Sequence, residues 1–468
     1  MTAQAFTAYG WVTCLWILVT SFQYGYHISA LNQIQAVLSC RGAERDVAIP
    51  RKYGLPTCIP MSDATFSVVT AVYTVGGLLG SLVANVVMDR WGRRGAVRAS
   101  AIMFAIGSGI MGISASLGPL IFGRLLVGIG AGFGLCVGPI YLSEIAPTKI
   151  QGAVGVLTQF AIVIGLMMTQ AVGLRLATPH EWRIVLVISS VISIGQLLVS
   201  PAIVESPSWL HRHGLLQDKA AASRKLWTVG ETPRRLPESL DSQDPLLSDV
   251  ERDADQATSL KDPEEHQASV SVPQLLTSTE FVKPLIIVCF AMLAQQLSGV
   301  NAVLYYSNDI LAKALPDLGP YVSLGITIVN VFMTFPPIFL IERLGRKKLL
   351  TLSTSGAVIS LLGVGFGLNT GVVALTSITI LTFVASFATG IGPVPFVMIP
   401  EVSPKHAVSA LSSVGLSLNW IANFLVGLVF LPLRNLLAQG DPQKEGRIFY
   451  LFAAMLAFCT FVLFRFYR

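Results

Sequence analysis

Long runs of apolar residues, separated by short polar segments, dominate the chain. Each run has about 20 residues or more, which at a rise of about 1.5 Å per residue is enough for a helix to cross a bilayer. The pattern predicts an all-α membrane protein with about twelve transmembrane helices. We predict spans over residues 9–31, 64–88, 97–117, 120–141, 152–175, 183–203, 284–306, 321–341, 349–369, 375–399, 408–433 and 447–466.

The two halves of this pattern repeat each other. Two pairs of matched segments recur in the same order: DRWGRR at 89–94 with ERLGRKK at 342–348, and PIYLSEIAP at 139–147 with VMIPEVSP at 397–404. Such a repeat predicts two six-helix bundles in parallel orientation, residues 1–204 and 284–468, with a substrate site between them near the middle of the membrane.

The segment between the halves, residues 205–283, is too polar to span a membrane. Its first part, 208–230, mixes Ala, Leu, Lys and Arg and predicts short amphipathic helices. From about 231 to 265 it is dense in Asp, Glu, Ser and Pro, which predicts disorder. We therefore treat 205–283 as a linker on one side of the membrane.

Charge gives the orientation. The basic segments 89–94 and 342–348, together with Lys149, Lys405 and the linker, fall on one side of the predicted membrane. Because basic loops remain cytoplasmic, we predict that this side and both termini face the cytoplasm. The formal net charge of +6 is explained by this loop bias and does not predict a nucleic-acid partner.

Composition agrees with a polytopic membrane protein whose partner is the lipid bilayer. Hydrophobic residues make up 53% of the chain and charged residues only 12%, about half the charged fraction of a soluble domain. Of the six cysteines, Cys40 and Cys58 share one polar loop. They form a disulfide if that loop faces an oxidising compartment, and remain free thiols otherwise.

Uncharged amides in the seventh span are the main candidate for a binding site. Gln295, Gln296 and Asn301 lie inside the apolar run 284–306. On a continuous helix Asn301 only partly shares a face with either glutamine, but Gly299 permits an irregular turn. Amides are costly in hydrocarbon unless they face a polar interior, and each both donates and accepts hydrogen bonds. They either hold neighbouring helices together or line the path of a neutral, hydroxyl-rich ligand, and three together favour the path.

The string QQLSGVNAVLYYS, residues 295–307, resembles the seventh-span signature of the sugar porters, the glucose-transporter branch of the major facilitator superfamily. The resemblance extends over nearly the whole chain except the linker insert. It implies a monomeric carrier that works by alternating access without a cofactor or metal.

The resemblance also implies further substrate-binding residues. Gln159 matches the family's fifth-span glutamine and Asn330 its eighth-span asparagine. Phe396 takes the place of a tryptophan that stacks against sugar, a change that loosens or redirects specificity. The eleventh span contributes an asparagine pair and a ring: Asn419, Asn423 and Trp420. Residues 390–395, with two glycines and two prolines, predict a break and hinge in the tenth span.

Charged residues at the cytoplasmic helix ends resemble the family's salt-bridge network. We expect them to latch the two bundles together in the outward-open state, although simple anchoring of the topology also explains the basic ones. The expected latch residues are Arg93, Arg94, Arg124, Glu144, Glu205, Arg346, Lys347 and Glu401. Arg124 is expected nearer the cytoplasmic end than the midplane. One family arginine is Gln151 here, so one pair of the network is in doubt, and whether Lys149 substitutes for it stays open.

His27 departs from the family pattern. The string FQYGYHISALN, residues 22–32, is similar to the first-span signature, in which proton-coupled members carry Asp and facilitative members carry Asn. Histidine titrates near neutral pH and accepts a proton from an acidic compartment, or it replaces the amide as a neutral hydrogen-bonding group. Both readings stay open, so protons are a second partner only if transport is proton-linked.

Two other departures lie at the cytoplasmic ends. The family's motif after the last span is absent, and the sixth-span string reads VESPS at 204–208. Both changes predict weaker locking of the cytoplasmic side.

The residues together predict transport of a hexose or a related neutral polyol. A sugar sensor on a transporter scaffold and a carrier of a cyclic acid such as quinate are the alternatives. The acid is disfavoured because no buried cation is apparent near the amides. No catalytic triad, metal cluster or phosphate loop predicts an enzyme. A plasma membrane and a vacuolar or lysosomal membrane fit equally well.

Overall fold

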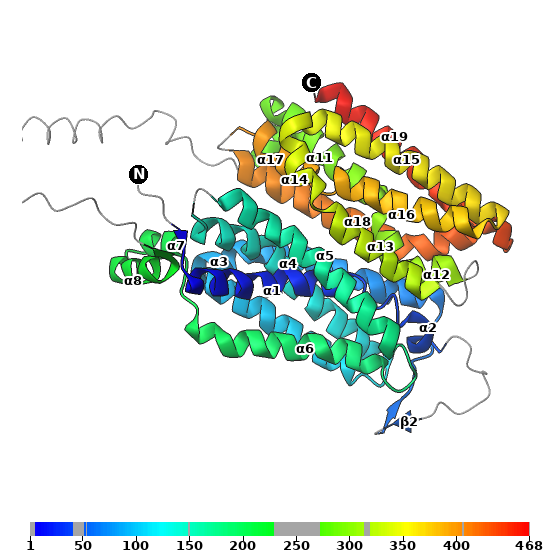
Figure 1. Cartoon of the computed structure of the whole chain (residues 1–468), viewed down its shortest axis with the longest axis horizontal. Helices are drawn as coiled ribbons and strands as arrows, with labels where there is room; N and C mark the ends of the chain where they lie inside the picture. The colour runs from blue at the N-terminus through cyan, green and yellow to red at the C-terminus, as the bar shows by residue number, and fades with distance from the viewer. Residues whose placement is uncertain are drawn as a thin grey trace, which may run out of the picture.

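In the computed structural model the chain folds into two helical bundles that lie side by side (Figure 1). The structure describes residues 5–40, 51–52, 54–147, 150–228, 272–312, 319–404 and 407–467. The N-terminal bundle holds α1 (Ala8–Ile28), α3 (Asp63–Gly112), α4 (Leu117–Ile145), α5 (Gln151–Leu176) and α6 (Trp182–Val199). Within it, α1 packs against α4 and α5, and α3 packs against α4 and α6.

The long helix α3 contains the second and third predicted spans. Gly92, with φ 75° and ψ 179°, interrupts the helical backbone between them. The basic loop expected at 89–94 is therefore reduced to a sharp turn, and helical residues continue on both sides of it.

Broken helices are characteristic of the C-terminal bundle. Its helices are α11 (Val282–Leu297), α12 (Val300–Ala312), α13 (Gly319–Met333), α14 (Pro336–Leu344), α15 (Arg346–Thr370), α16 (Val373–Thr389), α17 (Val394–Val402), α18 (Val408–Ala438) and α19 (Arg447–Phe466). The α16–α17 break confirms the predicted interruption of the tenth span. The break between α11 and α12 falls at Gly299, where a turn is expected.

The described helices fit the predicted number of spans. Nine stretches are long and apolar enough to cross a membrane, and α3 counts once among them although it contains two predicted spans. The 21-residue α1 and the α13–α14 pair supply the remaining two. The prediction of an all-α protein with about twelve membrane helices is confirmed.

Small elements mark the two ends of the bundles. At one end α2 (Gln35–Leu38) lies near β2 (Arg51–Lys52), which pairs antiparallel with β3 (Leu55–Pro56). Here Cys40 and Cys58 form a disulfide, which is one of the two alternatives that the sequence leaves open. We call this the disulfide end.

The opposite end, which we call the terminal end, holds both chain termini (Figure 1). The short helices predicted in the linker are confirmed there as α7 (Pro207–Arg212) and α8 (Leu216–Leu226). After them, β4 (Trp227–Thr228) pairs antiparallel with β1 (Ala5–Phe6). The linker residues expected to be disordered, 231–265, lie outside the described part of the chain. Minor elements are η1 (Ser200–Ala202), α10 (Val272–Thr277), η3 (Thr279–Phe281) and η5 (Pro442–Lys444).

The bundles meet through α3 with α18 and through α5 with α13. One apolar core is shared by both bundles and includes Tyr73, Leu120 and Val303. At the terminal end each bundle has a separate cluster, one around Val97 and Leu142 and the other around Phe281 and Ile399. Among the described residues, apolar packing therefore joins the bundles toward the disulfide end, and the clusters at the terminal end stay separate.

Candidate functional site

The break between α11 and α12 builds the amide cluster. Gly299 has φ 81°, and a Cβ at this position would lie 2.7 Å from the ring of Phe452. Only glycine suits both the backbone conformation and the space. The turn brings Asn301 back toward the end of α11, where its Nδ2 donates to Gln296 Oε1. A continuous helix would separate these two side chains, so the cluster depends on the break.

The amides form a connected chain of hydrogen bonds across three elements. Gln295 Oε1 accepts from Gln296 Nε2 at 3.2 Å and from Asn419 Nδ2 at 2.7 Å. Gln295 Nε2 donates to the backbone carbonyl of Gly392 at 2.7 Å, in the break between α16 and α17. Gln295, Gln296 and Asn301 are all buried. The structure therefore gathers four predicted residues into one neutral polar cluster, held partly by a carbonyl that the second break exposes.

Asn423 has a different environment. Its Oδ1 accepts from the hydroxyl of Tyr305 at 3.0 Å, and the neighbouring Tyr306 hydroxyl donates to Gly427 O at 2.9 Å. All these bonds tie α12 to α18. In this structure Asn423 therefore holds neighbouring helices together, which is one of the two roles considered for the amides.

Trp420 lies at the boundary between the bundles. Its indole Nε1 donates to Ser81 Oγ of α3 at 3.0 Å, and its ring packs so closely on Gly77 that any side chain there would clash. Tyr24 and Tyr73 contact the same ring edge-on. The side chain is 3% exposed. Trp420 joins the two bundles, where we expected a free apolar face for a ligand.

The other three predicted binding residues lie apart from the cluster. Gln159 is exposed on α5 and Asn330 is buried on α13, and these two helices pack against each other. Phe160 and Phe335 meet in the same contact region, with ring centroids 5.1 Å apart. Phe396 is exposed on α17. Among the described residues, no hydrogen bond joins the side chains of Gln159 or Asn330 to the amide cluster.

A second polar network, inside the N-terminal bundle, surrounds His27. The imidazole Nε2 lies 2.6 Å from Ser189 Oγ, which donates to Gln23 Oε1 at 2.9 Å. Gln23 Nε2 in turn donates to Ser193 Oγ at 2.7 Å. His27 is fully buried and stacks on Phe104. Sequence reasoning missed Gln23, Ser189 and Ser193, although polar residues at helical spacing in α6 were an available signal.

Arg124 adjoins this network, which corrects its expected position. The residue lies about 10 Å into α4 from the disulfide end and about 30 Å from Glu144 on the same helix. Its Nη1 donates to the backbone carbonyl of His27 at 2.8 Å, and its guanidinium lies 4.5 Å from the Tyr73 ring centroid. It lies far from the charged residues at the terminal end, and it is a buried cation beside the bundle interface that the sequence did not reveal.

The remaining charged residues of the N-terminal half do meet at the terminal end. Arg93 donates from Nε and Nη2 to both oxygens of Glu144, at 2.9 and 2.8 Å, and Arg212 of α7 adds a third contact at 3.2 Å. Arg94 Nη1 donates to the carbonyl of Ile203 at 2.8 Å. A bidentate pair of this kind has fixed geometry and is charge-assisted.

Glu205 caps the turn at Gly92. Its carboxylate accepts from the backbone N–H groups of Arg93, Arg94 and Ser206 at 2.8 to 3.1 Å. The N–H groups of Arg93 and Arg94 begin the second part of α3, and that of Ser206 belongs to the N-cap of α7; the N-terminus of a helix favours a negative charge. Burial nevertheless raises the pKa of the Glu205 carboxyl above its usual range, with the backbone N–H bonds opposing the rise.

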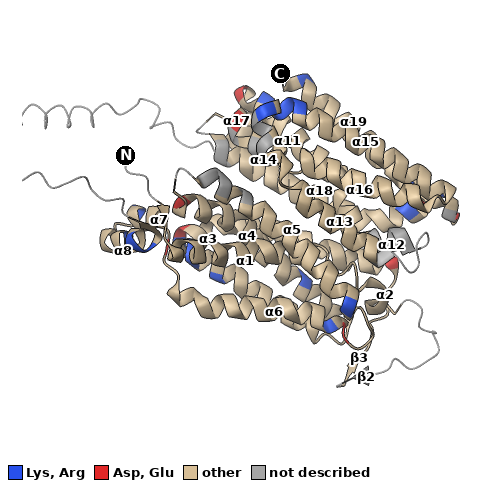
Figure 2. Ribbon diagram, in the orientation of Figure 1, with Lys and Arg blue, Asp and Glu red and all other residues tan. Residues whose placement is uncertain are grey.

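The C-terminal half repeats part of this arrangement. Arg346 donates from Nε to Glu401 Oε1 at 2.8 Å, and Nη2 lies at the same distance from that oxygen. Lys347 is exposed and makes no ion pair with any described residue. Figure 2 shows charged residues of both halves gathered at the terminal end.

The latch between bundles is expected in the outward-open state and stays a prediction, because the ion pairs of this structure lie within single bundles. Arg93–Glu144 joins α3 to α4, and Arg346–Glu401 joins α15 to α17, so each stays inside one bundle. Within the described ranges no ion pair connects the two halves. Lys149 lies outside the described residues, as does the side chain of Gln151.

Known transport proteins are similar to this chain in sequence and in fold. The family described as "Sugar (and other) transporter" matches residues 13–468. A probable metabolite transport protein of Saccharomyces cerevisiae is 31% identical over 450 residues, covering 94% of this chain and 89% of that protein. Human solute carrier family 2, facilitated glucose transporter member 4, is 32% identical over 463 residues, covering 96% and 85%. A partially occluded, inward-open structure of the xylose transporter XylE from E. coli shares the fold with a TM-score of 0.71, at 18% identity and 98% and 99% coverage.

Proposed function

The chain belongs to the sugar (and other) transporter family, and from that premise we propose that it carries a hexose or a related neutral polyol across a membrane by alternating access. The substrate crosses without chemical change. Gln295, Gln296, Asn301 and Asn419 are the proposed binding residues, with Gln159, Asn330 and Phe396 approaching from neighbouring helices as the bundles move.

The amide cluster is the observation that carries the proposal. It combines hydrogen-bond donors and acceptors with no net charge, inside a bundle where lone polar groups are costly. Hydroxyl groups of a sugar both donate and accept, so they can replace the bonds that the amides now make with one another. The exchange is nearly balanced in hydrogen bonds, as reversible transport requires.

Packing between the bundles supports alternating access. The shared apolar core lies toward the disulfide end, whereas the terminal end has two separate clusters. We propose that this state opens the site toward the terminal end and that rocking of the bundles reverses the arrangement. The basic turns at the terminal end support a cytoplasmic location for that end and for both termini. We propose a monomer in the plasma membrane or in a vacuolar or lysosomal membrane.

The surroundings of His27 favour facilitated transport. The imidazole is buried, and Arg124 donates to the carbonyl of the same residue. A proton on His27 would place a second positive charge next to this guanidinium in a water-poor interior, where repulsion is strong. Ser189 provides a hydrogen-bond partner for neutral imidazole. We therefore propose that His27 acts as a neutral hydrogen-bonding group.

Uptake of labelled glucose into liposomes that contain the purified protein tests the proposal. Uptake should rise to equilibrium at the same rate with and without an inward proton gradient, and His27→Asn should retain it. Accumulation above equilibrium that needs the gradient and disappears in His27→Asn would instead establish proton coupling. Glucose binding without any uptake would contradict transport and favour the alternative function, a sugar sensor.

Arg124 favours one second candidate, a polyhydroxy carboxylic acid such as quinate. Two of its guanidinium nitrogens, Nε and Nη2, have no partner among the described residues. An unpaired buried cation is the group that a carboxylate would seek. Competition of labelled glucose uptake by quinate distinguishes the candidates, since a neutral-sugar site should be inhibited by unlabelled glucose and not by quinate at the same concentration.

A further inference from the structure

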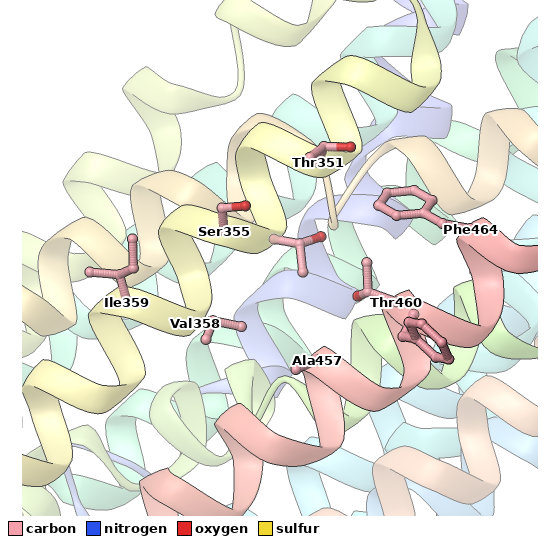
Figure 3. Close-up of a pocket in the computed structure, with 9 residues that line it drawn as sticks. Thr351, Ser355, Val358, Ile359, Ala457, Thr460 and Phe464 are labelled. Atoms are coloured by element: carbon pink, nitrogen blue, oxygen red, sulfur yellow. The ribbon is translucent and has the colours of Figure 1, made fainter.

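A groove between α15 and α19 lies on the outer side of the C-terminal bundle, away from the amide cluster. Its volume is about 400 Å³, and its lining combines apolar side chains with threonine and serine, including Thr351, Ser355, Val358, Ala457 and Phe464. Figure 3 shows these side chains converging from the two helices. Phe461 stands at the edge and is 72% exposed. A hollow of this kind on a membrane-spanning surface meets lipid, not water.

The groove has the length of one leaflet. From Thr351 to Ile359 along α15 is about 12 Å, compared with about 15 Å for half of a bilayer's hydrocarbon core. Thr351 lies five residues after the start of α15 at the terminal end, and Phe464 lies two residues before the end of α19. The groove thus begins near the membrane surface at the terminal end and runs inward.

Basic residues lie near the end of the groove that is closest to the terminal end of the bundle. Lys347 and Lys348 lie four and three residues before Thr351, on the same face of α15. Arg465 lies four residues after Phe461 on the groove face of α19. All three side chains are exposed. Figure 2 shows Lys and Arg residues at this end of the C-terminal bundle, near the C-terminus.

We propose that this groove binds one anionic phospholipid of the leaflet at the terminal end. An acyl chain fills the apolar groove, and the basic rim contacts the phosphate and the acidic headgroup. The mainly apolar lining of the groove favours an acyl chain over a soluble anion, and the charged rim favours an anionic lipid over a neutral one. The inference rests on the proposed orientation, which puts the rim at the leaflet that carries anionic lipid.

Native mass spectrometry of the full-length protein with added phosphatidylserine or phosphatidylcholine tests this site. Wild type should retain one phosphatidylserine more strongly than phosphatidylcholine. Lys348→Gln combined with Arg465→Gln should weaken that retention by about 30-fold, because each basic residue near the surface adds to the affinity for anionic lipid. The matched control, Arg224→Gln with Lys225→Gln on α8, removes the same charges at the same end and should change nothing.

A second variant tests the groove itself. Ala457→Phe fills its floor and should abolish selective retention, whereas Ala374→Phe, at an exposed site near the start of α16, should not. Soluble glycerophosphoserine should fail to displace the lipid. Equal loss in both charge variants, equal retention of phosphatidylcholine, or displacement by glycerophosphoserine would overturn the proposal.

Folding and transport are checked separately from lipid retention. Glucose uptake in phosphatidylcholine liposomes should be the same for wild type and Ala457→Phe, which shows that the variant is folded. If uptake fails for wild type in every lipid while phosphatidylserine is still retained, the proposed transport is wrong and the lipid site stands. If uptake occurs and retention is absent, only the lipid site is wrong.

Discussion

The two basic turns share a sequence pattern but are held in different ways. Gly92 and Gly345 adopt nearly the same left-handed conformation, with φ 75° and 77°. At Gly92 the carboxylate of Glu205 fills the space above the turn, and any Cβ there would clash with it. At Gly345 no described atom lies within 4 Å of the corresponding position.

The ion pair beside Gly92 is also more buried than the ion pair beside Gly345. The side chains of Arg93 and Glu144 are 7% and 13% exposed, whereas those of Arg346 and Glu401 are 28% and 34% exposed. The repeated motif therefore sets the backbone turn, while the linker residue Glu205 determines how tightly the turn is held. The N-terminal bundle is therefore fixed at the terminal end, and the C-terminal bundle is more loosely held.

Alanine at each glycine should give the largest difference. Both substitutions place a side chain in a region that essentially only glycine adopts, at a cost of about 1–3 kcal/mol. Gly92→Ala also displaces Glu205 and should reach about 3–5 kcal/mol. Thermal unfolding in detergent should show a much larger loss for Gly92→Ala than for Gly345→Ala. Equal losses would mean that Glu205 adds nothing to the turn.

Removing the arginines should give the next effect. Arg93→Ala leaves Glu144 buried with only Arg212 as a partner, and we expect a cost of about 3 kcal/mol. Arg346→Ala breaks a half-exposed pair and should cost at most about 1 kcal/mol. The same unfolding assay measures both, with Arg224→Ala on α8 as the control for loss of a basic residue at this end. A larger effect of Arg346→Ala would reverse the comparison.

Added salt should increase the difference in stability effect between the two arginine substitutions. Raising ionic strength from about 0.1 M to 1 M shortens the screening length from about 10 Å to about 3 Å. The destabilisation caused by Arg346→Ala should then shrink, because its pair is accessible to solvent. The effect of Arg93→Ala should stay nearly constant. Parallel unfolding curves at the two salt concentrations check this, and equal salt dependence would show that burial does not distinguish the pairs.

The smallest expected effect is a dependence on pH. Burial raises the pKa of the Glu205 carboxyl, so the folded state takes up a proton at a higher pH than the unfolded chain. Its contribution to stability is therefore greatest below the ordinary carboxyl range and decreases as pH rises through the raised pKa. Relative to Glu205→Gln, wild type should gain stability slightly as pH falls from 7 to 5. If wild type instead lost stability relative to Glu205→Gln as pH falls, the raised pKa of Glu205 would be contradicted.

Much of the fold was predictable because its causes are local. The length of each apolar run, the repeated basic turns and the glycines and prolines at 390–395 all act within a few residues. The disulfide between Cys40 and Cys58 followed from their shared loop, given an oxidising side. The amides Gln295 and Gln296 were recognisable because polar groups in an apolar span are costly unless they face a polar interior.

The rest depended on contacts between distant segments. Periodicity separates Asn301 from Gln296, and only the turn at Gly299, with its fit against Phe452, reunites them. Trp420 meets Ser81 across the bundle interface, which no spacing in either segment indicates. Arg124 is an exception, because the predicted span 120–141, entered from the non-cytoplasmic side, already places this residue near the disulfide end. The ion pairs stay inside bundles because each acidic partner lies on an adjacent helix of the same half.

Counterflow tests the central claim most directly. Liposomes containing the protein are preloaded with unlabelled glucose and diluted into a trace of labelled glucose. A carrier that alternates should give a transient overshoot of label, which Gln295→Ala abolishes and Gln217→Ala, an exposed glutamine on α8, retains. No overshoot in wild type, or an unchanged overshoot in Gln295→Ala, would contradict transport through the amide cluster.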